Sequence, residues 1–461
     1  MKPVITLIAL IVSSTAALAL PSEKDRVYTA DQNSNTVSVI DPVGNILLGQ
    51  IRLGNARPEI LSPLYKGEIN VHGLGFSPDH KTLIAVSTVT NSATFIDTTT
   101  NKVKGIAYVG RNPHEGFFTP DGKEAWIVVR GEDYLAIIDP STFKETGRIK
   151  TSSGPGMVIF SKDNKLAFVA NSFNAVVEVI DVAKREVIKQ IPVVSPFSPF
   201  IQVSPDGSEV WLTHKDVGKV TRIDTKSLEV RGVIDTGFIT NHLAFGQSAG
   251  STFAYVTVGG ENAVKVFTIE TDPKLLKTIS VGALPHGIWA SGDGSRIYVG
   301  LENGDAVDVI DTGKNEVVAR VPVGQAPQAL VYVPDAVKEG DGKANLVPRP
   351  QTPENVNIAL KAKSNSGEGF IVSRNLGLVD ILEINIFKLK PDTVYRVYLG
   401  DKQEPIAALK TNPKGMAAVS TVGPIRGIRP TDDKANADAA TIYVMEGEAK
   451  PSRESAILVG P

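Results

Sequence analysis

Four of the six histidines in the chain recur at matching places in a repeated pattern. His72, His114, His242 and His286 each stand at the start of a short apolar run that leads into a turn. Neutral imidazoles that converge on one point can hold copper, zinc or iron. The four histidines are therefore candidate metal ligands, provided that the fold brings them to a common place.

The pattern occurs seven times, and the histidines occupy one position of it, here called the reference position. The reference positions are His72, His114, Gly156, Pro199, His242, His286 and Gln328. They follow one another at steps of 42 to 44 residues. A period of this length with several short strands in each unit is typical of a propeller blade. The sequence therefore predicts an all-β fold with seven four-stranded blades over residues 26–335.

The two ends of this region complete each other. The apolar run Arg26 to Ala30 has the pattern of a blade's second strand, but no first-strand run precedes it. The run Gln328 to Val333 has the pattern of a first strand, but no second-strand run follows it. In a closed ring these halves would form one shared blade, which removes the free sheet edges. We expect a closing blade made from both ends of the propeller.

In a propeller, the inner strand of each blade starts beside the central funnel, so the reference positions should face the axis. The loops between the second and third strands open on the same face and bring a polar rim. The rim residues are Arg130, Glu132, Asp133, His214, Lys215, Asp216, Glu261, Glu302 and Asp305. From this rim we predict Arg130, His214 and Glu302 as ligand-binding residues for a small polar ligand or a peptide, and we assign no catalytic residue.

Both groups of residues also have an ordinary structural interpretation. Duplicated blades could have inherited one residue type, in which case the histidines would hydrogen-bond backbone between blades or line a wet channel. The rim could equally be a solvated surface. These residues do not identify a cofactor, and copper, zinc and iron are the candidate metals.

Several short motifs resemble the YVTN family of β-propeller repeats, which occurs in exported and surface-layer proteins. They are SPDG at 204–207, AYVTV at 254–258, FVANS at 168–172 and IDTTTNKV at 96–103. The resemblance implies a propeller over residues 26–335 and fits binding modules as well as proteins without an assigned role. Related propellers, such as nitrous oxide reductase and some copper oxidases and lactonases, do chemistry at the axis, but none of their complete signatures occurs here.

The ends of the chain differ from the repeats. Residues 1–19 read as a signal peptide, with Lys2, an apolar stretch and Ala17-Leu18-Ala19 as the cleavage site. The propeller is predicted over 20–335, a linker rich in Gly, Pro and charge over 336–354, and a small β-sandwich-like domain over 355–461. We expect an exported protein, periplasmic or at the cell surface, with no transmembrane anchor after cleavage.

Composition narrows the possible partners and cofactors. The net charge of −2 lacks the basic surplus that a nucleic-acid binder needs. Because the chain has no cysteine, haem thioether attachment and Fe–S clusters on Cys ligands are excluded.

Three hypotheses for the function remain. The first is a binding module that recognises a small ligand or an envelope protein at the funnel. The second is a His-ligated metalloenzyme, either an oxidoreductase or a lactone hydrolase, with its site on the propeller axis. The third is a structural or adhesive envelope protein.

Overall fold

The computed structural model describes residues 21–55, 64–351, 355–362, 367–375, 379–400, 402–423 and 441–460. The predicted signal peptide, 1–19, lies outside these residues. The described chain is built from β-strands, with no α-helix and one short 3-10 turn, η2 (Gly259–Glu261). None of its helical segments has the length and hydropathy of a membrane span.

Seven four-stranded antiparallel sheets form the predicted propeller. Blade 1 contains β28 (Pro327–Val333), β1 (Arg26–Asp31), β2 (Thr36–Asp41) and β3 (Ile46–Arg52). Blade 2 contains β4 (Val71–Phe76), β5 (Thr82–Ser87), β6 (Ser92–Asp97) and β7 (Val103–Tyr108). Blade 3 contains β8 (Pro113–Phe118), β9 (Ala125–Val129), β10 (Tyr134–Asp139) and β11 (Lys144–Lys150). Blade 4 contains β12 (Pro155–Phe160), β13 (Leu166–Asn171), β14 (Val176–Asp181) and β15 (Glu186–Pro192).

The remaining three blades follow the same order. Blade 5 contains β16 (Ile201–Val203), β17 (Glu209–His214), β18 (Lys219–Asp224) and β19 (Val230–Asp235). Blade 6 contains β20 (Thr240–Ser248), β21 (Ser251–Val258), β22 (Ala263–Thr268) and β23 (Leu275–Ser280). Blade 7 contains β24 (Pro285–Ala290), β25 (Arg296–Leu301), β26 (Ala306–Asp311) and β27 (Glu316–Pro322).

Burial explains why the three inner strands of each blade read as apolar runs. Blades pack face to face, so both sides of a middle strand are covered, as in β9, where all five residues are buried. The outermost strands, such as β11, are mostly exposed. Trp126 and Trp211 fill the spaces between neighbouring blades.

The expected closing blade is confirmed. Strand β28, from the end of the propeller, pairs antiparallel with β1 from its beginning, with Val27 opposite Tyr332. The Tyr332 hydroxyl donates to Asp25, and Asp25 also accepts from the Asp335 N–H at 2.8 Å. The ring therefore closes through hydrogen bonds between the two ends of the domain.

The C-terminal region is all-β, and its strands form a single eight-stranded sheet that curls into a nearly closed, barrel-like shape. The strand order is β33-β32-β35-β36-β29-β30-β31-β34, and the end strands β33 and β34 lie next to each other. The strands are β29 (Val356–Ala362), β30 (Glu368–Asn375), β31 (Asp380–Phe387), β32 (Val394–Leu399), β33 (Ala407–Lys410), β34 (Ala417–Gly423), β35 (Ile442–Glu446) and β36 (Leu458–Gly460). Its core includes Ile371, Leu382 and Val444.

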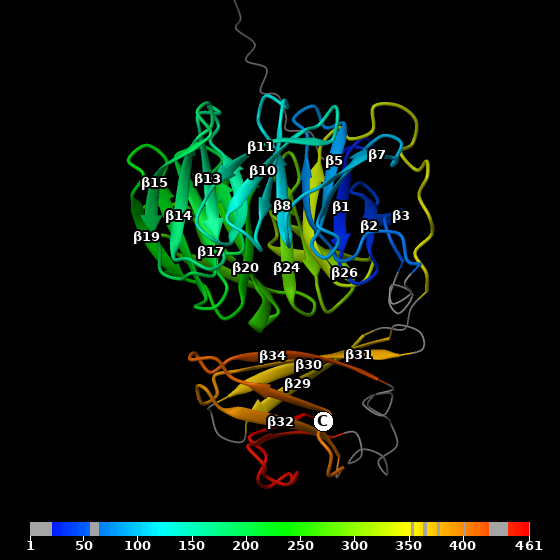
Figure 1. Cartoon of the computed structure of the whole chain (residues 1–461), viewed down its shortest axis with the longest axis vertical. Coiled ribbons are helices and arrows are strands. Elements are labelled where there is room, and N and C mark those ends of the chain that lie inside the picture. The colour runs from blue at the N-terminus through cyan, green and yellow to red at the C-terminus, as the bar shows by residue number, and fades with distance from the viewer. Residues whose placement is uncertain are drawn as a thin grey trace, which may run out of the picture.

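The segment between the two parts is bound to the propeller along most of its described length. Asn101 donates to the carbonyls of Gly342 and Ala344, at 2.9 Å each, and Gln50 pairs with Val347 as an isolated β-bridge. The yellow trace in Figure 1 follows this path down the side of blades 1 and 2 to the C-terminal sheet. The described part of the segment predicted as a linker, residues 336–351, is therefore held against the side of the propeller.

The C-terminal sheet lies against one face of the propeller (Figure 1). Buried Arg374 of β30 forms an ion pair with Asp305 and donates to the Glu302 carbonyl at 3.0 Å. Lys414 forms an ion pair with Asp216, and the Phe387 ring stacks on Phe238. These contacts all fall on the loops of the face that carries the reference positions.

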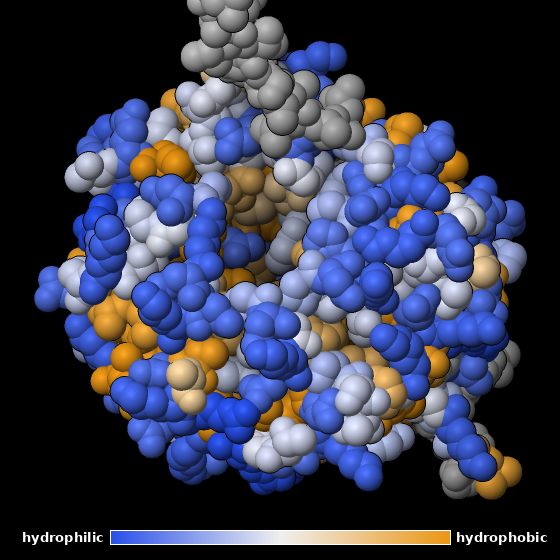
Figure 2. Space-filling model, turned by 90° about the horizontal axis from the view of Figure 1, so that it is seen from above, coloured by the Kyte–Doolittle hydropathy of each residue, from blue (hydrophilic) through white to orange (hydrophobic). Residues whose placement is uncertain are grey.

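The opposite face is open at the axis. Figure 2 looks onto that face and shows a hollow at its centre. A cavity of about 310 Å³ lies there, lined by aromatic side chains that include Phe76, Phe245 and Trp289. The two ends of the axis therefore differ, with an aromatic mouth on one side and the reference positions on the other.

Candidate ligand site at the propeller axis

Two sets of equivalent positions build the site. The first is the set of reference positions at the start of the inner strands. The second is the residue that follows the second strand of each blade, and its members are Gln32, Thr88, Arg130, Ser172, Lys215, Gly259 and Glu302. Hydrogen bonds or electrostatic coupling join four of these, Gln32, Arg130, Lys215 and Glu302, to the axial histidines.

His72 and His114 are bonded to each other. Their Nε2 atoms lie 2.8 Å apart, and Nδ1 of His114 donates to the Gly156 carbonyl at 2.7 Å. A neutral His114 that donates through Nδ1 accepts through Nε2, so His72 is the donor of the His72–His114 bond. His72 then accepts at Nδ1. The Gln32 atom 2.9 Å from Nδ1 is Oε1, which also accepts, so the Gln32 amide must be turned to place its NH₂ group there as the donor.

Charge opposes the other arrangement, in which His114 would carry two protons. Burial, followed by the nearby charge of Arg130, lowers the pKa of both His72 and His114 well below the ordinary value. Both rings are therefore neutral near pH 7. The result is a directed hydrogen-bond chain from Gln32 through the two rings to the backbone of blade 4.

His242 and His286 form the second pair. Their rings meet edge to face at 4.9 Å, and His242 stacks on Phe200. Nδ1 of His286 donates to Glu302 at 2.7 Å. Burial raises the pKa of Glu302, but the hydrogen bond from His286 and the charges of His286 and Lys215 outweigh burial and hold that pKa at about 2. Glu302 is therefore an ionised carboxylate that fixes the orientation of His286.

Arg130 and Lys215 bring two positive charges to the same place. Both are partly exposed, and within the part of the chain that the structure describes neither makes an ion pair or a side-chain hydrogen bond. Burial lowers the pKa of Lys215. The negative charge of Glu302 acts against this lowering, whereas the positive charge of Arg130 adds to it. The two cations therefore lie close enough to repel each other, and no bonded carboxylate neutralises either one.

Glu115 is the acidic residue whose charge acts on the pKa of Arg130, but it is a poor counter-ion. Its side chain is buried and accepts one hydrogen bond, from the Leu74 N–H at 3.1 Å. Burial raises the pKa of Glu115 well above its usual value, against the lowering effects of that bond and of Arg130. Burial therefore works against the ionised form of Glu115, and no ion pair joins Glu115 to Arg130 among the described residues.

The structure separates His214 from the other predicted site residues. His214 is the last residue of β17 and is fully buried inside blade 5, where Nδ1 lies 3.0 Å from Ser198 Oγ and Nε2 lies 2.7 Å from Thr221 Oγ1. The adjacent Lys215 points to the axis instead, since successive side chains of a strand alternate. Lys215 belonged to the predicted rim but not to the three residues selected from it.

The sequence carries a signal that distinguishes these two residues. Arg130, Lys215 and Glu302 each stand sixteen residues after the reference position of their blade, whereas His214 stands fifteen after it. Arg130 and Glu302 lie at the axis as expected. Gln32, which the prediction missed, takes the same place in the closing blade.

The four axial histidines remain a prediction as metal ligands. No group of three or more His, Asp or Glu side chains among the described residues is arranged to hold a metal ion. The direct hydrogen bond between His72 and His114 occupies both Nε2 atoms, and the charges of Arg130 and Lys215 oppose a further positive charge. As arranged, the cluster suits an anion better than a metal cation.

Comparisons with known proteins agree on the fold. A family model described as a YNCE-like β-propeller matches residues 108–348. No curated protein matches the chain. Among solved structures, hydrazine synthase of Kuenenia stuttgartiensis is 22% identical, with a TM-score of 0.52, over 60% of this chain and 94% of that chain.

Two further structures are similar in the same way. The periplasmic gluconolactonase of Pseudomonas aeruginosa is 18% identical, with a TM-score of 0.54, over 67% of this chain and 99% of that chain. The dihydro-heme d1 dehydrogenase NirN is 13% identical, with a TM-score of 0.51, over 87% of this chain and 75% of that chain. At these identities the likeness concerns the fold alone.

Proposed function

This chain belongs to the YNCE-like β-propeller family, and we propose that it is a binding module whose axial cluster holds a small anion, with a carboxylate or phosphate group as the recognised part. The observation that carries the proposal is the pair of cations, Arg130 and Lys215, beside neutral histidines. Within the described residues neither cation makes an ion pair, and Glu302 is the one ionised carboxylate that acts on Lys215. A partly buried cation that lacks a bonded counter-ion is unfavourable until an anion pairs with it.

Each of the two cations has a distinct part in binding. The Arg130 guanidinium offers a planar fork of N–H donors that matches a carboxylate or phosphate, and the Lys215 ammonium adds a compact point charge. His242 makes no side-chain hydrogen bond within the described residues, so its ring can present an N–H donor. Glu302 would repel an anion that came too close, which sets the side of the cluster where the anion lies.

The C-terminal sheet supports recognition at this end of the axis. Among the described residues, its ion pairs with the propeller are made at Asp305 and Asp216. Asp305 stands three residues after Glu302, and Asp216 directly follows Lys215. The sheet therefore holds the loops that carry two of the charged site residues. We infer that it both positions these loops and limits the size of the ligand that can enter.

Calorimetric titration with acetate, malonate and phosphate tests the proposal. Each cation would contribute a charge-assisted hydrogen bond worth about 1.5–3 kcal/mol, so Arg130→Ala or Lys215→Ala should weaken binding about 10- to 100-fold. The control is the double variant Lys102→Ala/Arg453→Ala, which removes two exposed charges away from the axis. Equal affinities of wild type and the axial variants would contradict the proposal.

A second candidate function, lactone hydrolysis, has one observation in its favour. Because His286 donates to Glu302 through Nδ1, its Nε2 lone pair is available as a general base. Nε2 would take a proton as water adds to the lactone carbonyl, and the oxyanion would face Lys215. Collapse breaks the ring C–O bond, the proton passes to the leaving oxygen, and a hydroxy acid results. Titration of acid release from gluconolactone, with His286→Gln as the variant, tests this function.

We further propose that the protein acts outside the cytoplasm, periplasmic or at the cell surface. The support is the signal-like pattern of residues 1–19 and the fold that the chain shares with a periplasmic protein. N-terminal sequencing of the protein isolated from its native envelope should find Leu20 as the first residue. An uncleaved Met1 would contradict export by this route.

A further inference from the structure

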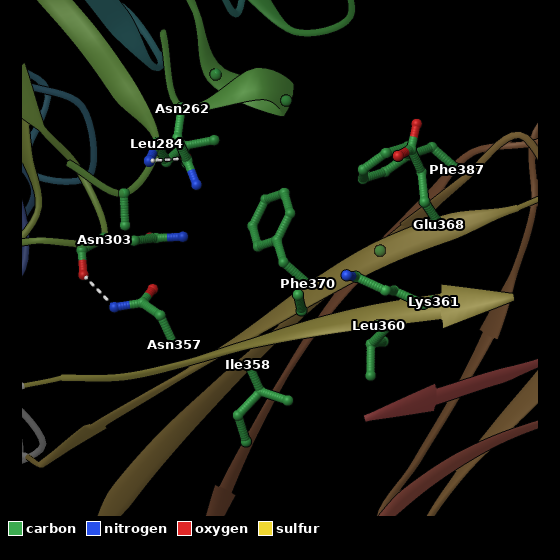
Figure 3. A pocket seen from close by; sticks show the side chains of 15 residues that line it. Asn262, Leu284, Asn303, Asn357, Ile358, Leu360, Lys361, Glu368, Phe370 and Phe387 are labelled. Carbon is green, nitrogen blue, oxygen red and sulfur yellow. Dashed lines mark hydrogen bonds between the residues drawn. The ribbon is translucent and has the colours of Figure 1, made fainter. Parts of the chain in front are cut away.

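A second cavity lies between the propeller and the C-terminal sheet, beside the loops of blades 6 and 7 that also carry Gly259 and Glu302. It has a volume of about 280 Å³ and is bounded by the loops of blades 6 and 7 on one side and by β29 to β31 on the other (Figure 3). Small-molecule sites range from roughly 300 to 1,000 Å³ and occur often at domain interfaces. The size is that of a site for one small ring.

One wall of the cavity is a flat apolar platform. Phe370 of β30 is partly exposed and pairs across the sheet with Ala359, so no bulky neighbour covers its ring on that side. Figure 3 shows the Phe370 ring standing in the cavity. Phe387 closes one end, held by its stack with Phe238 at 4.3 Å. On the opposite side, Gly259 and the residue after it contribute backbone without side chains.

Asparagine side chains surround this platform. Asn303 is 2% exposed, and its Oδ1 has no hydrogen-bond partner in the described part of the chain. Figure 3 shows its side chain directed toward Phe370. Asn262 uses its Oδ1 to accept from the Leu284 N–H at 2.9 Å, which leaves its NH₂ group as a donor. Asn357 donates to the Asn303 carbonyl at 3.1 Å and keeps its own oxygen as an acceptor.

Lys361 and Glu368 are the two charged side chains among the residues that line the cavity. They are opposite each other on β29 and β30, and Glu368 also forms an ion pair with Lys388. The other lining groups, Phe370 and the asparagines among them, carry no charge. A neutral ligand therefore matches most of the cavity wall.

From these features we propose that the cavity between the two parts of the protein binds a neutral sugar ring. The C–H face of a hexose is apolar and matches the Phe370 ring. Its hydroxyl groups both donate and accept, as do the amides of Asn262, Asn303 and Asn357. A bound hydroxyl would also give the buried Asn303 oxygen the partner that it lacks. This site is independent of the anion site proposed at the axis.

Saturation-transfer NMR on the full chain tests the proposal with glucose, galactose, mannose and N-acetylglucosamine as probes. A single ring offers few atoms, so a millimolar dissociation constant is expected. Transfer to the ring C–H protons is expected for at least one of these sugars. Phe370→Ala should abolish the transfer, and Asn303→Ala should weaken binding about tenfold.

Controls separate this site from a general loss of structure and from the axial cluster. Phe173→Ala removes an aromatic ring that is 59% exposed on blade 4 and should leave the transfer unchanged. Arg130→Ala/Lys215→Ala should also leave it unchanged. Melting temperatures of all variants identify any that fail to fold. The proposal is overturned if none of the four sugars shows transfer, or if the transfer persists in a folded Phe370→Ala variant.

Discussion

Acid should destabilise the propeller through its buried histidines, and His214 allows the size of the effect to be worked out. Burial lowers the pKa of His214 to about 4 from 6.5, against the raising effect of Asp216 and together with the lowering effect of Lys414. Below pH 6.5 the unfolded chain takes up a proton that the folded chain refuses. Stability from His214 is therefore complete above pH 6.5 and is lost as the pH falls from 6.5 toward 4.

The magnitude follows from the shift. At about 1.4 kcal/mol per pH unit, His214 alone removes about 2 kcal/mol of unfolding free energy between pH 6.5 and pH 5. His72, His114, His242 and His286 have lowered pKa values and change stability in the same direction. The total loss should therefore exceed the His214 part.

Urea unfolding at pH 7.5 and pH 5, followed by tryptophan fluorescence, measures the effect. All three tryptophans lie in the propeller, so the signal reports on that part of the chain. His214→Gln cannot be protonated and can keep one of the bonds to Ser198 and Thr221. Its loss of stability between the two pH values should be about 2 kcal/mol smaller than that of wild type. Equal losses in the two proteins would show that protonation of His214 does not cause the loss of stability.

Three further results are expected. Arg374→Ala removes the buried ion pair with Asp305, so the C-terminal sheet should detach and the radius of gyration from X-ray scattering should rise; an unchanged radius would show that other contacts hold the sheet. Glu209→Gln breaks the buried pair with Arg222 and should lower the unfolding free energy by about 3 kcal/mol in urea, whereas a change below about 1 kcal/mol would contradict this assignment. After incubation with copper, zinc or iron salts and dialysis, the protein should retain less than one metal ion per chain, because Arg130 and Lys215 already bring positive charge to the axis. Retained metal that is lost when His242 and His286 are replaced would instead favour the metalloenzyme hypothesis.

The propeller fold could be predicted from the sequence because the same pattern of buried strands and tight turns recurs in every blade. Every blade needs the same buried strands and the same tight turns, so the 42- to 44-residue step and the unmatched runs at Arg26 and Gln328 indicated both the blade count and the closing blade. The C-terminal sheet has no such repeat, and its alternating runs indicated strands without their order. The docking of this sheet onto the propeller depends on individual contacts between distant residues, such as the ion pair of Arg374 with Asp305. No local sequence pattern predicts such a contact.

The axial site could be predicted in part, because the spacing of the repeat also determines which residues face the axis. The reference positions are fixed by the repeat, so the histidines were found, and Arg130 and Glu302 follow from the same spacing. His214 was selected over Lys215 for its chemistry, although the spacing favours Lys215. Which imidazole bonds which partner depends on how neighbouring blades face each other, and only the folded ring shows that His72 meets His114.

The most direct test of an anion site at the axis is a crystal of the full chain soaked in selenate, which replaces sulfate or phosphate and scatters anomalously. We expect an anomalous peak within hydrogen-bond reach of both Arg130 and Lys215, and we expect it to be absent in crystals of Arg130→Ala/Lys215→Ala. Selenate bound only at exposed surface lysines, with no peak at the axis of the wild-type protein, would contradict it.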